Sequence, residues 1–162
     1  YAGKGRVVLR NLDFNHVISD TAALISSSLS QSAELRWQLA LALPAIRGDA
    51  TQIQQVVMNL LLNASEAIGE MRGVISVQTG RRQISRSELD CAAHANDAKE
   101  GEYVCMEIND TGGGMAPDVL ARIFDPFFST KFTGRGLGLA AVLGIVRSHG
   151  GMIPAESRIA EG

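Results

Sequence analysis

The sequence predicts an α/β fold, in which helices and strands follow one another within a single domain. Three observations predict it. The chain has 162 residues, 46% of them hydrophobic and 20% charged, which is the balance of one globular domain. Residues 49–68 repeat apolar side chains at helical spacing, whereas several shorter segments alternate apolar and polar residues as strands do. The formal net charge is only −2, so no nucleic-acid partner is expected, because binding to a phosphate backbone needs a basic surface.

The N-terminal part of the chain predicts a linker, a helix and a strand. Residues 1–14 are Gly-rich at their start and are interpreted as the linker. Over residues 15–29 the apolar side chains keep helical spacing, and either Asn15 or Asp13 can serve as the N-cap. Residues 35–41 alternate in polarity and therefore predict a strand.

The longest predicted helix covers residues 49–68. Asp49 is its expected N-cap, and Gln52 three residues later gives a variant of the capping box. A turn is expected at 44–48, just before this helix. Trp37, in the preceding strand, is interpreted as a core residue.

The C-terminal half predicts two antiparallel strands followed by glycine-rich segments. The strands are expected at 74–79 and 102–109, and the polar, Ala-rich residues 85–101 between them are interpreted as a surface loop. The remaining segments, in order, are a glycine cluster after Asp110, a short helix from Pro117, a Phe-rich turn, a second glycine cluster at 134–138, and a helix over 139–149 that Gly150 and Gly151 end.

The cysteine content and the length of the apolar stretches indicate the kind of environment in which the chain works. Cys91 and Cys105 form no CxxC pair and no disulfide framework, which is typical of a reducing compartment. The apolar stretch at 139–146 is far shorter than the ~20 residues that span a bilayer. The chain does not begin with Met, and it is interpreted as a segment of a longer protein.

Two familiar nucleotide-binding motifs do not fit. The P-loop pattern GxxxxGK[ST] is absent. Residues 136–141 match the dinucleotide fingerprint GxGxx[GA], but that fingerprint must follow a buried strand. Here it follows the polar residues 130–135, and too few residues remain for a doubly wound sheet. The match is therefore interpreted as coincidence.

A third scheme uses residues that lie far apart in the sequence. Asn59 and Asn63 share one face of the predicted helix, and Glu66 extends the same stripe. An Asn side-chain oxygen can ligate a hard cation such as Mg²⁺, whose site is completed by phosphate oxygens and water. Taken alone, the pair also fits two ordinary surface residues.

The glycine clusters fit the same scheme. A carboxylate at Asp110 can accept a hydrogen bond from an exocyclic amine such as adenine N6, and Gly112 and Gly114 let the backbone approach a flat ligand. Backbone N–H groups at the start of the 139–149 helix can bind an anion. Taken alone, one cluster fits a turn and the other a flexible loop. The second cluster consists of Gly134, Gly136 and Gly138, with Lys131 and Arg135 as nearby cations.

The joint pattern closely resembles the catalytic and ATP-binding domain of sensor histidine kinases, in the GHKL superfamily with its Bergerat-type ATP fold. The resemblance runs from about residue 13 to residue 151, and four motifs occur in the family's order. They are Asn59-Leu-Leu-Leu-Asn63-Ala, Asp110-x-Gly-x-Gly, Phe124-Asp-Pro-Phe-Phe128-Ser-Thr-Lys131 and Gly134-x-Gly-Leu-Gly-Leu139.

The resemblance implies a role for each matching residue. Asn63 would ligate Mg²⁺, Asp110 would select adenine, and residues 116–134 would form a mobile lid over ATP. Asn59 occupies the place where hydrolysing relatives carry a Glu as general base, which an amide cannot replace. The residues expected to act in catalysis are Asn59, Asn63 and Lys131. The residues expected to bind ATP are Asn59, Asn63, Asp110, Gly112, Gly114, Met115, Ile123, Phe128, Lys131, Gly134, Arg135, Gly136, Leu137, Gly138 and Leu139.

The chain departs from the family pattern at two places. Glu66 stands where many of these kinases carry a basic residue, as in the subgroup similar to nitrogen-regulation kinases. Pro154 interrupts the segment that forms a strand in the family, because proline cannot donate to a sheet ladder. The family's last strand is expected to be missing from residues 15–162, the range assigned to the catalytic domain.

The resemblance implies a two-layer α/β sandwich, with a mixed, mainly antiparallel sheet covered on one face by about three helices. The implied enzyme is a protein-histidine kinase of a two-component system, which uses ATP and Mg²⁺. Its implied partners are the dimerisation and phosphotransfer helices upstream of the linker and a response-regulator receiver domain. The domain is expected in the cytoplasm, as a monomer when isolated and in a homodimer when full-length. Two alternatives stay open: a GHKL ATPase, and a nucleotide-gated binding module without kinase activity.

Overall fold

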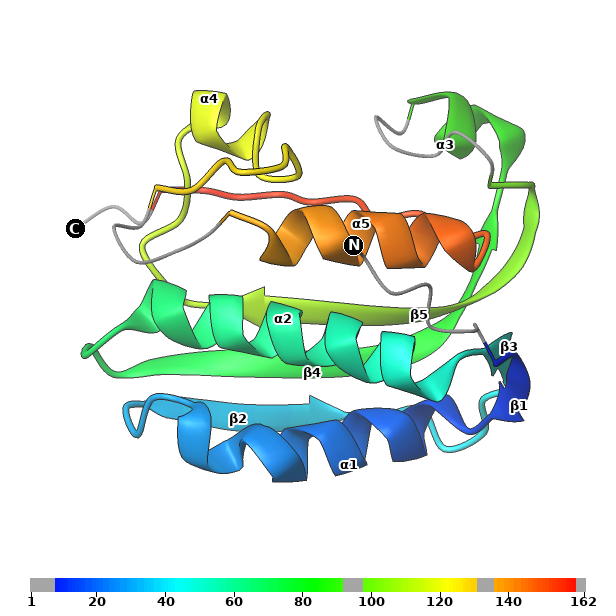
Figure 1. The fold of residues 1–162 in the computed structure, drawn as a ribbon, viewed down its shortest axis with the longest axis horizontal. Helices are drawn as coiled ribbons and strands as arrows, with labels where there is room; N and C mark the ends of the chain where they lie inside the picture. The colour runs from blue at the N-terminus through cyan, green and yellow to red at the C-terminus, as the bar shows by residue number, and fades with distance from the viewer. Residues whose placement is uncertain (1–7, 92–97, 131–135, 160–162) are drawn as a thin grey trace, which may run out of the picture.

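The structure is a computed structural model that describes residues 8–91, 98–130 and 136–159. Its main sheet has the strand order β2-β4-β5. Strand β2 (Ala33–Gln38) runs parallel to β4 (Gly73–Ile84), and β4 runs antiparallel to β5 (Gly101–Asp110). A separate small sheet pairs β1 (Arg10–Leu12) with β3 (Ile46–Gly48). The central strand β4 therefore holds the main sheet together (Figure 1).

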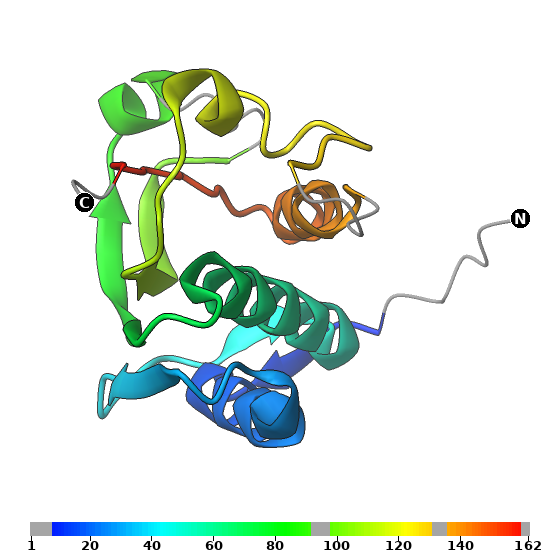
Figure 2. The same cartoon turned by 90° about the vertical axis from the view of Figure 1, so that its left-hand side faces the viewer.

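Three helices cover one face of the main sheet. They are α1 (Phe14–Ile25), α2 (Ala50–Ile68) and α5 (Gly138–Ser148), and Figure 2 shows them together on one side of the strands. This arrangement confirms the predicted two-layer α/β class with a mixed sheet. The short helices α3 (Arg86–Cys91) and α4 (Pro117–Leu120) lie on the same side of the molecule, above α5 in Figure 1. None of the described helices is both long and apolar enough to cross a bilayer.

The hydrophobic core lies between the helices and the sheet. It joins Ile18 of α1 to Val57 and Leu61 of α2, and it reaches Ile75 and Val77 on the inner face of β4; all five side chains are fully buried. Burial of a Leu or Ile side chain stabilises a fold by about 1.5–3 kcal/mol, so this cluster fixes where α2 lies on the sheet. Helix α2 supplies most of the candidate site, so the core also positions that site.

The two long N-terminal helices begin as the sequence predicts. The Asp13 carboxylate accepts from the backbone N–H of His16 at 3.1 Å, which makes Asp13 rather than Asn15 the N-cap of α1. The Asp49 carboxylate accepts from the N–H groups of Thr51 and Gln52 at 3.0 and 3.3 Å. Helix α2 ends at Gly69, whose φ of 64° only glycine adopts readily.

Part of the predicted linker belongs to the fold. Strand β1 and the first residue of α1 fall within residues 1–14, so that range is folded from Arg10 onward; residues 1–7 lie outside the described part. Likewise, β3 occupies most of the predicted turn at 44–48. Both strands have three residues, which is too short for an alternating pattern to show in the sequence.

Two further expectations were wrong. The predicted loop at 85–101 contains α3, which starts with a reciprocal cap: Glu88 accepts from the N–H of Ser85 at 2.8 Å, and Ser85 Oγ accepts from the N–H of Glu88 at 3.4 Å. Trp37 is 40% exposed rather than buried, because it lies near the end of an edge strand. Residues 149–159 form no strand in the structure, in keeping with the interruption expected at Pro154.

Candidate functional site

Helix α2 carries the two asparagines on which the candidate site is built. Asn59 and Asn63 lie one turn apart, and both are half-buried. Neither amide has a hydrogen-bond partner among the described residues. A half-buried amide without a protein partner loses hydrogen-bonding energy unless a ligand or water supplies one. These side chains are therefore available to hold a ligand.

The start of α5 lies against Asn59. A Cβ added at Gly138 would lie 3.3 Å from Oδ1 of Asn59, so the absence of a side chain allows this close approach. The helix has no side-chain N-cap, which leaves its first backbone N–H groups without a capping partner. Such N–H groups attract anions, and here they lie next to an amide oxygen suited to a cation. The structure thus joins two motifs that are far apart in the sequence.

The loop after β5 packs against the other end of α2. A Cβ at Gly112 would lie 2.6 Å from the carbonyl carbon and oxygen of Ala67, and the N–H of Gly113 donates to that oxygen at 3.4 Å. Asp110, the last residue of β5, accepts from the N–H of Gly112 at 2.9 Å through Oδ1. Its other carboxylate oxygen has no partner in the described part of the chain. The exposed carboxylate can accept one more hydrogen bond.

Gly114 and Met115 contact the C-terminal residues, which the sequence did not suggest. Gly114 has a φ of 69°, and a Cβ there would overlap the carbonyl oxygen of Arg158. The N–H of Met115 donates to Oγ of Ser157 at 2.8 Å. No sequence signal marks Ser157, because a single serine in an irregular segment has no motif. The absence of a side chain at Gly114 therefore allows a close approach between two backbones.

The second glycine cluster contacts the Phe-rich turn. Gly136 has a φ of 63°, and its carbonyl accepts from the N–H of Phe127 at 2.9 Å. A Cβ at Gly136 would lie 2.6 Å from the carbonyl oxygen of Phe128. The guanidinium of Arg122 lies 4.4 Å from the centre of the Phe128 ring, as in a cation–π pair. The turn and the glycine cluster are therefore held together by backbone contacts.

The remaining residues that were predicted to bind ATP have fewer contacts in the structure that bear on the site. Ile123 is half-buried just after α4, Leu137 is 44% exposed, and Leu139 is half-buried in the first turn of α5. Three predicted site residues lie outside the described part of the chain, namely Lys131, Gly134 and Arg135.

The structure therefore brings three predicted pieces onto one helix. Asn59 lies beside Gly138, Asn63 is one turn further along, and Gly112 lies against the end of the same helix at Ala67. An amide oxygen suited to a cation and a helix start suited to an anion lie together at Asn59 and Gly138, and the loop that follows Asp110 lies at the end of the same helix. A nucleoside triphosphate with its metal ion has this pattern of charge.

Comparisons with known proteins agree with this geometry. Residues 48–162 match the family model described as "Histidine kinase-, DNA gyrase B-, and HSP90-like ATPase". The chain is 37% identical over 153 residues to the sensor kinase CckA of Brucella abortus, which covers 93% of the chain and 16% of CckA. It is 36% identical over 157 residues to the sensor histidine kinase ZraS of Escherichia coli, covering 96% of the chain and 30% of ZraS. The chain thus spans less than a third of either relative.

Solved structures with the same fold include several sensor kinases. The mycobacterial sensor histidine kinase MprB superimposes with a TM-score of 0.65 at 25% identity, over 88% of this chain and 81% of that one. Full-length ShkA in complex with AMPPNP gives 0.64 at 26% identity, over 88% and 27%. The histidine kinase ThkA in complex with the response regulator TrrA gives 0.55 at 19% identity, over 76% and 32%, which bears on the fold alone.

Proposed function

We propose that this chain, the catalytic, ATP-binding domain of a sensor histidine kinase, transfers the γ-phosphoryl group of ATP to a histidine on a helix outside residues 1–162. The chain belongs to the family of histidine kinase-, DNA gyrase B- and HSP90-like ATPases. The observation that carries this proposal is the meeting of Asn59 with the start of α5 at Gly138. That meeting provides an amide-lined place for a triphosphate beside an uncapped helix start.

Each site residue has a distinct part in the proposed reaction. The half-buried oxygen of Asn63 suits Mg²⁺, which takes its other ligands from phosphate oxygens and water. The ion would neutralise charge on the transferring phosphoryl group. The free oxygen of Asp110 would accept from adenine N6, and the N–H groups at the start of α5 would hold phosphate oxygens. Asn59 would orient ligands but cannot take a proton from water, which disfavours hydrolysis.

The two histidines in the described part of the chain do not suit the role of acceptor. His149 uses both ring nitrogens: Nε2 accepts from the N–H of Asp49 at 3.1 Å, and Nδ1 lies 2.9 Å from the carbonyl oxygen of Ile145. His16 pairs with Asp20 at 3.3 Å on α1, outside the helix pair that forms the site. His94 lies outside the described residues. We therefore place the acceptor on dimerisation helices of the same protein.

The same proposal extends to the partner, the oligomeric state and the location of the full-length protein. The ThkA structure is described as a complex with a response regulator, and we propose a receiver domain as the final phosphoryl acceptor here too. We further propose a homodimeric full-length kinase that works in the cytoplasm, where its substrate ATP is found. Glu66, where many kinases of the family carry a basic residue, supports a place in the subgroup similar to nitrogen-regulation kinases.

Labelled ATP separates this function from its alternatives. The full-length protein is incubated with ATP labelled on the γ-phosphate, and protein-bound and free phosphate are measured. Acid-labile label on the protein is the expected result. Free phosphate with no labelled protein would identify an ATPase, and neither product would identify a binding module. The Asn63→Ala variant should abolish labelling, whereas Gln55→Ala, an exposed change on the same helix, should preserve it.

A further inference from the structure

One edge of the main sheet has no strand beside it. Among the described residues β2 pairs only with β4. The N–H of Gly73 donates to the carbonyl of Ser32 at 3.0 Å, so Ser32 and every second residue after it direct their backbone groups toward β4. The backbone groups of Ala33, Leu35 and Trp37 must then point away from the sheet. The N–H of Ala33 is already used, because it donates to Ser30 at 3.0 Å.

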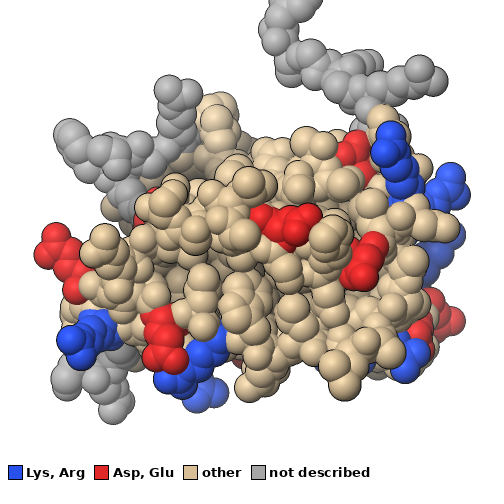
Figure 3. All heavy atoms as spheres, turned by 90° about the horizontal axis from the view of Figure 1, so that it is seen from below, with Lys and Arg blue, Asp and Glu red and all other residues tan. Residues whose placement is uncertain are grey.

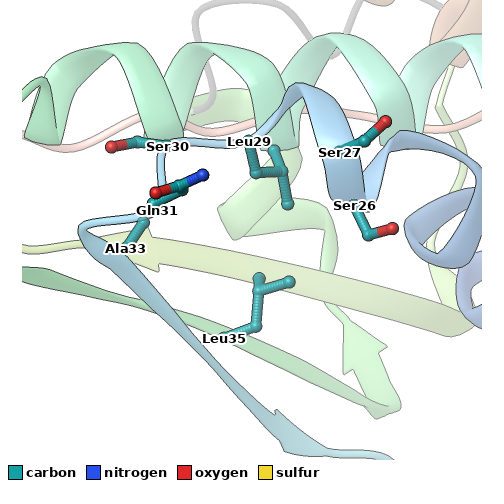
Figure 4. A pocket seen from close by; sticks show the side chains of 7 residues that line it. All are labelled: Ser26, Ser27, Leu29, Ser30, Gln31, Ala33 and Leu35. Carbon is teal, nitrogen blue, oxygen red and sulfur yellow. The ribbon is translucent and has the colours of Figure 1, made fainter.

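The free edge lies beside a hollow on a weakly charged face. A hollow of about 390 Å³ opens between the 3₁₀ turn η1 (Ser26–Ser28) and β2 (Figure 4). Leu29, Ala33 and Leu35 give it an apolar floor. Uncharged side chains form most of the face that carries α1 and β2, and Lys and Arg gather toward its ends (Figure 3). A further strand placed against β2 could bury apolar side chains here.

The charges on β2 are arranged to pair with a copy of themselves. Glu34 and Arg36 lie on the outer face of the strand and form an ion pair, with 2.8 Å between Arg36 Nε and Glu34 Oε1. If a second β2 ran antiparallel with Leu35 opposite Leu35, each Glu34 would face Arg36 of the other copy. Edge strands often carry charges that repel a neighbouring strand. The opposite charges of Glu34 and Arg36 would instead attract the same pair on a second copy.

The backbone pattern agrees with the same register. Leu35 directs both its N–H and its C=O outward, so the two copies of Leu35 can exchange both hydrogen bonds. The N–H of Trp37 can donate to the carbonyl of Ala33 in the other copy. This bond uses the C=O of Ala33, so the N–H of Ala33 can keep its bond to Ser30. Glu34 and Arg36 then fall at positions that are not hydrogen-bonded, where facing side chains come closest. The hydrogen bonds and the charges therefore select the same register.

We propose that two copies of this domain associate through antiparallel pairing of their β2 edges, centred on Leu35, to form one continuous sheet with two-fold symmetry. The interface is isologous, as in most homodimers. Since the Glu34–Arg36 pair already exists in each copy and is exposed, the charges fix the register more than they add affinity. The association is therefore weak, and it is promoted when another part of the protein holds two copies together.

Charge reversal tests the register directly. Glu34→Arg leaves two arginines on the edge, and Arg36→Glu leaves two glutamates, so each variant repels itself in the proposed register. Facing like charges should weaken self-association about tenfold in each variant. Mixing the two variants makes every facing pair opposite in sign, so a heterodimer at least as tight as the wild-type dimer is expected. Sedimentation over a wide concentration range, with melting curves to check folding, measures this.

A matched control and two contrary outcomes complete the test. Arg81 and Glu102 form a comparable exposed pair at 3.7 Å between β4 and β5, away from the β2 edge, and reversing either should leave association unchanged. A chain that stays monomeric up to its highest soluble concentration overturns the proposal. A dimer that the β2 reversals do not affect also overturns it, because the contact then lies on another face. Neither result bears on ATP binding, which is measured separately.

Discussion

The backbone N–H of Asp49 donates to Nε2 of His149 at 3.1 Å, and this bond joins the start of α2 to the end of α5. The opposite ring nitrogen, Nδ1, lies 2.9 Å from the carbonyl of Ile145 and carries the proton when Nε2 accepts. The Asp49 carboxylate caps α2 and also accepts from the N–H of Val8 at 2.9 Å. One residue thus connects the incoming chain, α2 and α5, at the end of the helix pair opposite Asn59 and Gly138.

Replacement of His149 should destabilise the domain. His149→Ala leaves the N–H of Asp49, a residue only 9% exposed, without its acceptor, and we expect a loss of about 1–3 kcal/mol in the free energy of unfolding. His149→Gln can restore an acceptor oxygen and should recover part of the loss. Urea unfolding of the three proteins measures this. Equal stability of His149→Ala and the wild type would show that the bond contributes nothing.

Asp49 should make stability depend on pH in the acid range. Hydrogen bonds from the N–H groups of Val8, Gln52 and Thr51, with the nearby His149, lower the pKa of the Asp49 carboxyl below its ordinary value. A lowered pKa means that the contribution to stability is complete above the unfolded-state pKa and is lost as pH falls through the folded-state value. The loss is therefore expected below about pH 4.

The Asp49→Asn variant tests this assignment, because an amide does not titrate. Its stability should fall less than that of the wild type over the same acid interval, although it starts lower. Thermal unfolding at a series of pH values gives both curves. Parallel curves for the two proteins would assign the acid loss to other carboxylates.

Asn63 should couple metal to nucleotide. Asn63→Ala should remove most of the gain in ATP affinity that Mg²⁺ gives, while adenosine, which has no phosphate, should bind almost as before. The increase in melting temperature with ATP, measured with and without Mg²⁺, reports the coupling. The exposed Gln55→Ala change on the same helix is the control. An undiminished Mg²⁺ effect in Asn63→Ala would refute the ligand role.

Asp110 should set the choice of base. Asp110→Ala should weaken ATP binding by about 1.5–3 kcal/mol, the range for a lost hydrogen bond to a charged group. The loss for GTP should be much smaller, because GTP carries a carbonyl where ATP carries the amine. Calorimetry with both nucleotides measures the difference, with Asn109→Ala as the neighbouring control. Equal losses for the two nucleotides would contradict the assignment.

Substitutions at Gly138 and Gly144 should have different effects on ATP affinity and on stability. A Cβ there would lie 3.3 Å from Oδ1 of Asn59, whereas a Cβ at Gly144 on the same helix meets nothing within 4 Å. Alanine favours a helix interior by about 1 kcal/mol over glycine, so Gly144→Ala should stabilise the domain without changing ATP affinity. Gly138→Ala should lower ATP affinity with little loss of stability. Similar ATP affinities in the two variants would argue against a tight site at Asn59.

Long periodic segments could be predicted from the sequence, and short or irregular ones could not. Helix α2 (Ala50–Ile68) follows the predicted range 49–68 with Asp49 as its N-cap, because the cap and the apolar face lie within one continuous segment. Strands β1 and β3 each have three residues and form only because they meet each other. Helix α3 had a signal in Ser85-x-x-Glu88, but the surrounding polar residues concealed it.

Some contacts of the candidate site could also be predicted from the sequence, and others could not. The meeting of Asn59 with Gly138 follows from motifs whose order suggested it. The contacts of Gly114 with Arg158 and of Met115 with Ser157 depend on where the irregular C-terminal residues return, which no local pattern encodes. The hydrogen bond from the N–H of Asp49 to the ring of His149 is likewise a contact between residues distant in sequence, which no local pattern encodes.

The order of strands in the main sheet has a kinetic consequence. Parallel pairing sets Ala33 beside Gly73, with α2 between them in the chain, and β4 meets β5 only across the segment that holds α3. No pair of neighbouring strands in the described sheets is joined by a tight hairpin, so no local β nucleus is available when the chain begins to fold. Large loops must close before any ladder bond is gained, which costs entropy early and slows the search. Helix α2, with its 19 residues, is the segment best able to form first and to give the strands a surface on which to collect.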